Sequence, residues 1–144
     1  MNFLNEKFNI IETVETKNGV EKFVIDKKDL LPCLSFLKEN QDMLLSITAV
    51  DLAEKIEVFY DLYSSQNNEH FLISVKVYSD NPVIESVSKL FKSAAFDERE
   101  IFDLFGVEFD GNDNLKRLLL PDFFVGNPML KNFKPQRNER QNYA

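Results

Sequence analysis

Alternating apolar and polar residues in the first half of the chain predict a pair of β-strands. The segment 56–63 places one apolar set on a single face, namely Ile56, Val58, Tyr60 and Leu62. The segment 71–77 repeats this pattern after a polar stretch at 64–68. Because a period of two residues is typical of a half-buried strand, the two segments predict an antiparallel hairpin.

Two further patterns add strands to this sheet. The segment 44–50 is mostly apolar, which is typical of a largely buried strand. Alternation over 8–14 and a short apolar run at 22–25 flank a turn that ends at Gly19, and they predict a second hairpin.

Helical periodicity first appears between these strands. The segment 29–40 has an inner stripe of Leu30, Leu34 and Leu37. Asp29 can cap this helix, and Pro32 is tolerated in its first turn. We therefore predict a helix over 29–40.

A second helical stripe runs through Val87, Leu90, Phe91, Ala94, Glu98, Ile101 and Phe105. The pair Asn81–Pro82 predicts its start, since Pro favours the first helical position, and Gly106 predicts its end in the left-handed conformation. Ser86 and Ser93 can each cap a new start, so the pattern leaves open whether one helix or two cover 83–105.

The order of these elements predicts an α+β fold, a two-layer sandwich with a mixed or antiparallel β-sheet packed against two to three helices. A short pairing of Val107 and Phe109 with Leu118 and Leu120 is also predicted. We expect one domain over residues 1–133. The polar, basic tail 134–144 lacks periodicity and is predicted to be disordered.

Composition and charge narrow the possible partners and compartments. The net charge of −7 repels phosphate backbones, so nucleic acid is not expected as a partner. A single cysteine fits a reducing compartment, and we expect Cys33 to be a buried small hydrophobe. No signal peptide is recognisable, and the apolar runs fall far short of the roughly 20 residues that span a bilayer. A cytoplasmic protein is expected, reaching a membrane only through a partner.

Glu98 is the most unusual placement, because it lies on the apolar stripe between Ala94 and Ile101. A carboxylate there must be paired, hydrogen-bonded or protonated. It is either a general acid with a raised pKa, aided by Glu100 or Asp103, or a buried ion pair. No nucleophile, metal ligand or phosphate loop lies nearby in the sequence, which favours the ion pair.

Arginine supplies the candidate partners for this charge. Arg117 or Arg99 would pair with Glu98 if the ion-pair interpretation holds. Arg99 and Asp103 lie four residues apart, a spacing typical of a solvated pair on a helix surface.

Metal and nucleotide sites find little support. His70 is the single histidine, so zinc and iron–sulfur ligation in the usual ways are not expected. The segment 110–114 resembles a calcium loop, but Leu115 stands at the position that requires Gly and Pro121 at the position that requires Glu. The four glycines do not fall into a nucleotide-binding spacing.

The segment 98–111, which reads ERE, IFDLFG and VEFDG, closely resembles the signature of the C subunit of complex I, the NADH:quinone oxidoreductase. The resemblance continues through 115–121 and 124–133 and covers roughly residues 28–133. The same family includes the equivalent subunits of membrane-bound, energy-converting [NiFe] hydrogenases. Its motif positions here are Glu98, Arg99, Glu100, Asp103, Gly106, Arg117 and Pro121.

This resemblance implies a cofactor-free, non-catalytic subunit of the peripheral arm, on the cytoplasmic face of the inner membrane. Its implied partners are the large subunit, which forms the quinone site in complex I or carries the nickel–iron centre in the hydrogenases, and an iron–sulfur subunit. Iron–sulfur clusters and FMN, or the nickel–iron centre, would belong to these partners. The expected interface residues are Phe102, Phe123, Phe124, Lys131 and Phe133.

The chain departs from the family pattern where the family usually has histidine or tryptophan. Asn112 and Asn127 stand where the family usually has histidine, and Phe96 and Phe124 stand where it usually has tryptophan. Three alternatives to a complex I subunit remain from the sequence: a hydrogenase subunit, a stand-alone hydrolase that uses Glu98, and a free adaptor.

Overall fold

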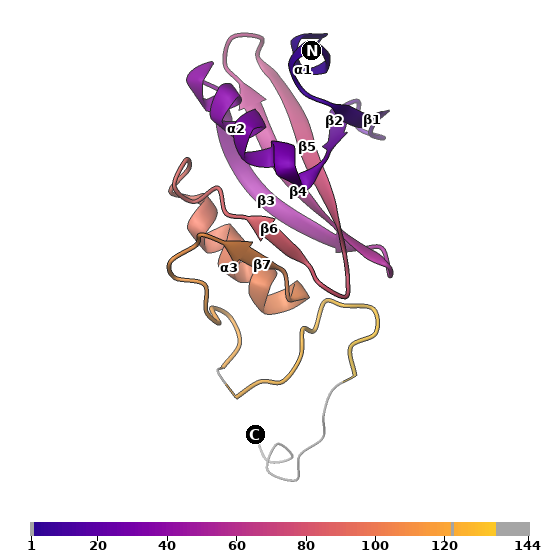
Figure 1. Cartoon of the computed structure of the whole chain (residues 1–144), viewed down its shortest axis with the longest axis vertical. Helices are drawn as coiled ribbons and strands as arrows, with labels where there is room; N and C mark the ends of the chain where they lie inside the picture. Colours follow the sequence, from indigo (N-terminus) through magenta and orange to yellow (C-terminus); the bar gives the residue numbers. More distant parts are fainter. Residues whose placement is uncertain (1, 122, 135–144) are drawn as a thin grey trace.

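The computed structural model describes residues 2–121 and 123–134, and its largest element is a five-stranded mixed sheet (Figure 1). The strand order is β1-β2-β5-β4-β3. The strands are β1 (Ile10–Glu15), β2 (Glu21–Ile25), β3 (Met43–Asp51), β4 (Lys55–Ser64) and β5 (Glu69–Tyr78). All neighbours pair antiparallel except β2 and β5, which are parallel. The predicted α+β class with a mixed sheet is confirmed.

Strand register follows from the alternation in the sequence. Ile56 pairs with Val77 and Leu62 with Phe71, so the apolar residues of β4 and β5 share one face of the sheet. Those residues are buried. A one-residue slip would expose the whole set, and burial therefore fixes the register.

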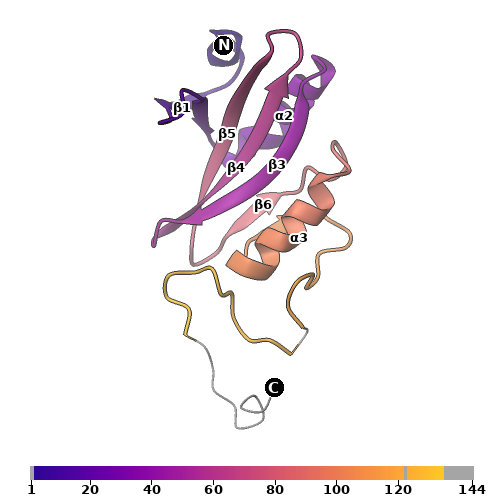
Figure 2. The same ribbon diagram turned by 180° about the vertical axis from the view of Figure 1, so that it is seen from behind.

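Helix α2 (Leu30–Glu39) covers this apolar face, lying in front of the sheet in Figure 1 and behind it in Figure 2. It is preceded by a 3₁₀ turn at Lys27–Asp29, where the Asp26 carboxylate accepts a hydrogen bond from the Lys28 N–H. The predicted helix is therefore present. Its predicted cap is wrong, because Asp29 makes no side-chain capping bond.

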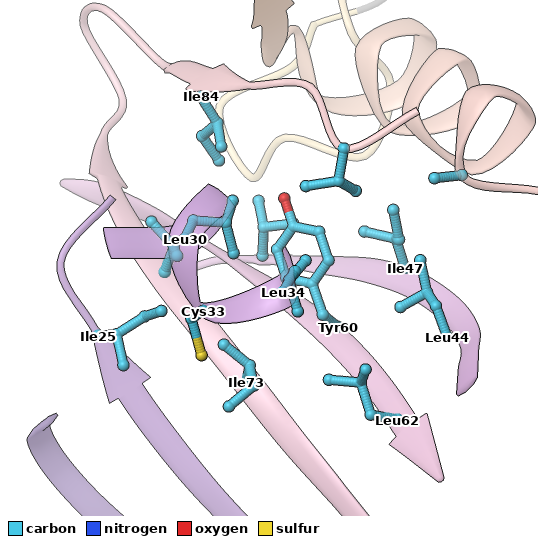
Figure 3. Packing of buried hydrophobic residues seen from close by; sticks show 14 of the residues in the cluster. Ile25, Leu30, Cys33, Leu34, Leu44, Ile47, Tyr60, Leu62, Ile73 and Ile84 are labelled. Carbon is cyan, nitrogen blue, oxygen red and sulfur yellow. The ribbon is translucent and has the colours of Figure 1, made fainter. Parts of the chain in front are cut away.

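The hydrophobic core lies between α2 and the sheet (Figure 3). Leu30, Cys33 and Leu34 of α2 point toward Ile73 and Tyr60 of the sheet. Cys33 is fully buried, as the sequence predicts. Burial, together with the nearby charge of Asp29, raises the pKa of its thiol to about 12, so the thiol stays protonated and packs as an apolar group.

The second predicted helix starts at the last of the three positions that the sequence leaves open, directly after Ser93, although the Ser93 side chain makes no capping bond. The pair Asn81–Pro82 does not begin a helix, and the residues that follow form strand β6 (Val83–Glu85). This strand pairs in parallel with β7 (Glu108–Asp110), and Ile84 is buried. Pairing with a distant segment overrides the local helical pattern. Helix α3 spans Ala94–Phe105 instead.

The predicted pairing of Val107 and Phe109 with Leu118 and Leu120 is also wrong. Phe109 lies in β7, opposite Ile84 of β6. Residues 118–120 form no strand in the structure. A short helix α1 (Asn2–Lys7), which no sequence pattern indicates, precedes β1.

Helix α3 packs mainly against β3, an edge strand of the sheet, and lies beside β6 in both views (Figures 1 and 2). The segment 115–134 continues from this region along the end of the sheet. The prediction for the tail 134–144 falls outside the described residues except at Lys134. In the described ranges no helix is both long enough and apolar enough to cross a bilayer.

Candidate functional site

The described part of the segment 115–134 has no helix or strand, yet it is fastened to the C-terminal end of α3. Arg117 Nη1 donates to the Asp103 carbonyl at 2.8 Å, and the Met129 N–H donates to the Leu104 carbonyl at 3.0 Å. Asn127 Nδ2 donates to the carbonyls of Phe102 and Asp103 at 3.3 and 3.1 Å. The last carbonyls of a helix lack partners within the helix, so this segment supplies the missing donors.

Asp103 is the centre of this attachment. Its Oδ1 pairs with Arg117 Nη1 at 2.9 Å. Its Oδ2 accepts from the backbone N–H groups of Leu118, Leu119 and Leu120 at 3.2, 2.7 and 2.9 Å. Burial of the carboxylate acts to raise its pKa, but Arg117 and the three N–H donors outweigh burial and lower the pKa of Asp103.

Arg117 joins this centre to the far part of the segment. Its Nη2 donates to the carbonyls of Phe124 and Gly126 at 3.3 and 3.0 Å. Pro121 is exposed, and its carbonyl accepts from the Phe124 N–H at 2.9 Å. The planar guanidinium of Arg117 therefore binds the carbonyls of Phe124 and Gly126 and the end of α3 at the same time. A lysine lacks this fixed fork of donors and could not bind all of them.

Arg99 does not form the predicted solvated pair with Asp103. Both side chains are buried, and Asp103 pairs with Arg117 instead. Arg99 makes long contacts of 3.4 Å with the carbonyls of Lys116 and Arg117. The prediction fails because the segment 115–134 covers the helix face that the sequence pattern treats as exposed.

Glu98 is fully buried, at 0% exposure, as its place on the apolar stripe predicts. Its carboxylate accepts from the Ser86 hydroxyl at 2.6 Å, the Val87 N–H at 2.8 Å and Asn112 Nδ2 at 3.0 Å. The predicted arginine partner is therefore wrong, because neutral donors surround this carboxylate. Burial raises the pKa of Glu98, and the nearby charge of Asp97 adds to it, while the three hydrogen bonds oppose the rise.

Gly106 ends α3 in the left-handed conformation, with φ of 76°, as the sequence predicts. A Cβ at this position would lie 2.7 Å from Asn127 Oδ1. The glycine therefore serves two purposes: it permits the positive φ, and it leaves room for the Asn127 side chain that caps the helix.

We expect Gly106→Ala to lower the free energy of unfolding by more than the roughly 1–2 kcal/mol that the left-handed conformation costs an L-residue. Urea denaturation measures this change. Gly19→Ala is the matched control, since Gly19 has φ of 79° but its added Cβ would meet nothing closer than 3.9 Å. Equal losses in the two variants would show that the approach of Asn127 is unimportant.

The expected interface residues differ in exposure. Phe123 is 75% exposed, and Lys131 is exposed as well. Phe124 and Phe133 are half-buried and stack on each other with ring centroids 5.9 Å apart, and Phe102 is half-buried too. Other large apolar side chains of the segment also face solvent, namely Leu118, Leu119, Val125 and Met129.

A catalytic use of the carboxyl groups finds no support in this geometry. Glu98 is shielded from solvent, and Asp103 is held by Arg117 and backbone donors. Glu100 is exposed on the surface of α3. Within the described part of the chain, no group of three or more His, Cys, Asp or Glu side chains is arranged to hold a metal ion.

Sequence reasoning missed three residues that shape this region: Ser86, Asn112 and Asn127. Ser86 and Asn112 bind the Glu98 carboxylate, and Asn127 caps α3. Both asparagines stand where the resembling family usually has histidine, so the departure from the motif was the available signal.

Comparisons with known proteins agree with this picture. The family model described as the 30 kDa subunit of the respiratory-chain NADH dehydrogenase matches residues 23–139. The C subunit of the NADH-quinone oxidoreductase of Moorella thermoacetica is 36% identical, over 94% of this chain and 95% of its own. A C/D subunit of the NADH-quinone oxidoreductase of Psychrobacter is 30% identical, over 86% of this chain and 23% of its own.

A solved structure shares the fold. The trypsin-resistant fragment (1–134) of Nqo5 superposes with a TM-score of 0.66 at 26% identity, covering 72% of this chain and 89% of the fragment. Sequence, fold and motif therefore lead to the same assignment. The chain belongs to the family of the 30 kDa subunit of respiratory-chain NADH dehydrogenase, whose bacterial relatives are the C subunits of NADH-quinone oxidoreductases.

Proposed function

We propose that the chain works as a docking subunit, which binds the large D subunit of an NADH-quinone oxidoreductase through the segment 115–134 and the end of α3. One observation carries this proposal. A segment without helix or strand in its described part is held in place by Asp103 and Arg117, and it presents exposed apolar side chains. Such a fixed apolar patch is typical of a protein interaction site.

The hydrogen bonds that hold the segment against α3 support binding. Loops that order only on association lose affinity to the entropy of ordering, so a preformed surface binds more tightly for the same contacts. Aromatic anchors such as Phe123 are enriched among the residues that dominate interface energies. In this proposal the stacked pair Phe124 and Phe133, the half-buried Phe102 and the exposed Lys131 complete the binding surface.

The identity of the partner is supported by the Psychrobacter relative, whose name joins the C and D subunits of the enzyme in a single polypeptide. We infer that the present chain contacts a D subunit of the same kind. The proposal also keeps what the resemblance implies: an iron–sulfur subunit as a second partner, cofactors held by the partner subunits, and a position at the cytoplasmic face of the membrane.

The double variant Leu119→Asp/Phe123→Asp tests the docking surface. We expect its affinity for the purified large subunit of the same organism to fall at least about 30-fold, since losing an anchor residue costs about 2 kcal/mol or more. Surface plasmon resonance measures the affinity. Urea denaturation should give an unchanged free energy of unfolding, because both side chains are exposed.

Met43→Asp is the matched control. Met43 is exposed, but it pairs with Tyr63 at one end of β3, whereas the Lys131 N–H binds Asp51 at the other end. This variant should bind the large subunit normally. Wild-type affinity in the double variant would rule out the proposed surface.

A further inference from the structure

A small groove lies between the edge strand β3 and helix α3. Its lining residues are Ile47, Thr48, Ala49, Glu100, Ile101, Leu104, Phe105 and Met129. Its volume is about 190 Å³. Pockets for small-molecule ligands measure roughly 300–1,000 Å³, so the groove is suited to one large side chain rather than to a metabolite or cofactor.

Hydrogen bonds fix the three walls of the groove, which are β3, α3 and Met129. Asp97 Oδ2 accepts from the Ile47 N–H of the edge strand at 3.0 Å, which fastens the start of α3 to β3. The Met129 N–H donates to the Leu104 carbonyl, which fastens the third wall to the end of α3. The groove is therefore built before any partner arrives, and Met129 connects it directly to the exposed segment 115–134.

Charge decides what kind of side chain the groove accepts. The lining is apolar except for Thr48 and Glu100, and among the described residues Glu100 is the one charged group that lines it. Glu100 is exposed at the rim, and no described lysine or arginine lines the groove. An apolar side chain that enters here would bring its neighbour next to this carboxylate, which favours a cation and disfavours an acid.

We propose that the groove receives one large apolar side chain of the large subunit, adjacent to an arginine or lysine that contacts Glu100. This inference rests on the proposed function, since it names the chemistry of the partner at one point of that surface. An anchor residue in a preformed pocket, flanked by a rim charge pair, is a common arrangement in protein interfaces.

Two variants test the proposal with the purified large subunit and the full chain. Glu100→Arg reverses the rim charge on an exposed helix position, and we expect about 10-fold weaker binding at low salt. This loss should shrink as sodium chloride is raised, because exposed charges are screened. Ala49→Leu fills the groove, and we expect about 10-fold weaker binding at every salt concentration. Urea denaturation checks that both variants fold.

Glu39→Arg is the matched charge control, since Glu39 is exposed at the end of α2, away from the groove. It should bind like the wild type. If Ala49→Leu folds poorly, Glu100→Arg alone tests the proposal, through a loss of affinity for the large subunit that depends on salt.

The outcomes separate the groove from the wider docking surface. If Leu119→Asp/Phe123→Asp weakens binding but Glu100→Arg and Ala49→Leu do not, the groove proposal is overturned and the docking function stands. If none of these variants weakens binding, both proposals fall. Deletion of residues 135–144 should leave binding through the groove intact. Disappearance of the Glu100→Arg and Ala49→Leu effects in the truncated chain would show that the tail, not the large subunit, uses the groove and would overturn the proposal.

Discussion

Asp103→Asn is expected to lower the free energy of unfolding by about 3 kcal/mol, because removing one charge from a buried ion pair costs roughly 3–5 kcal/mol. The carboxylate binds Arg117 and three backbone N–H groups at once. An asparagine has one acceptor oxygen and would turn an NH₂ group toward these donors. Urea denaturation at neutral pH measures the change.

The same variant should loosen the segment 115–134 before it unfolds the sheet. The backbone amides of Leu118, Leu119 and Leu120 lose their common acceptor, so hydrogen exchange of these amides should accelerate more than exchange in β4 and β5. Glu100→Gln is the matched control, since it removes one negative charge from an exposed position three residues earlier. If Asp103→Asn lowers the free energy of unfolding no more than Glu100→Gln does, the central role of Asp103 is disproved.

The contribution of Asp103 to the free energy of unfolding should depend on pH in one direction. Because the folded pKa of Asp103 lies below its ordinary value, the stabilisation is complete above the unfolded pKa of roughly 3.9 and is lost as pH falls through the folded pKa. The wild type should therefore lose its advantage over Asp103→Asn only in acid, below about pH 4.

Glu98→Gln is the second variant with a large expected effect. The free energy of unfolding of the variant should rise relative to that of the wild type as pH increases. The folded pKa of Glu98 is raised, so between the unfolded value of roughly 4.3 and the folded value the folded state binds more protons than the unfolded state. The wild type must then lose stability as pH increases across this window and level off above it. Glutamine does not titrate, and the variant should lack this loss.

Comparing unfolding free energies of the two proteins between pH 4 and pH 8 isolates this group. Asp42 also has a pKa raised by burial, but it is present in both proteins and cancels in the difference. Burial raises the pKa of Tyr60 well above its ordinary value, so its hydroxyl stays protonated throughout this pH range and adds no titration of its own. Parallel pH profiles for wild type and variant would refute the buried, proton-binding state of Glu98.

Local patterns predicted much of the fold. Strands β3, β4 and β5 and helix α2 appear where alternation and helical stripes place them, because burying one face of an element imposes its period on the sequence. Gly106 likewise ends α3 as predicted, since a positive φ at a helix end favours glycine for local reasons.

Predictions that depended on distant partners failed. Residues 83–85 follow the predicted helix start at Asn81–Pro82, but they form β6 because β7 offers a parallel partner more than 20 residues away. The sequence also assigned arginine to Glu98 and left Asp103 at the surface. In the structure Arg117 reaches Asp103, while Ser86, Val87 and Asn112 converge on Glu98.

The amino-acid sequence alone sufficed to recognise the family, the buried faces of β4, β5 and α2, and the burial of Glu98. These are properties of short segments, in which spacing and side-chain type suffice. The donors that meet each buried carboxylate, and the apolar side chains of 115–134 that remain exposed, depend instead on how the chain packs in three dimensions. Burial requires that a carboxylate be hydrogen-bonded but does not specify by which group, so the choice depends on where folding brings distant polar residues together.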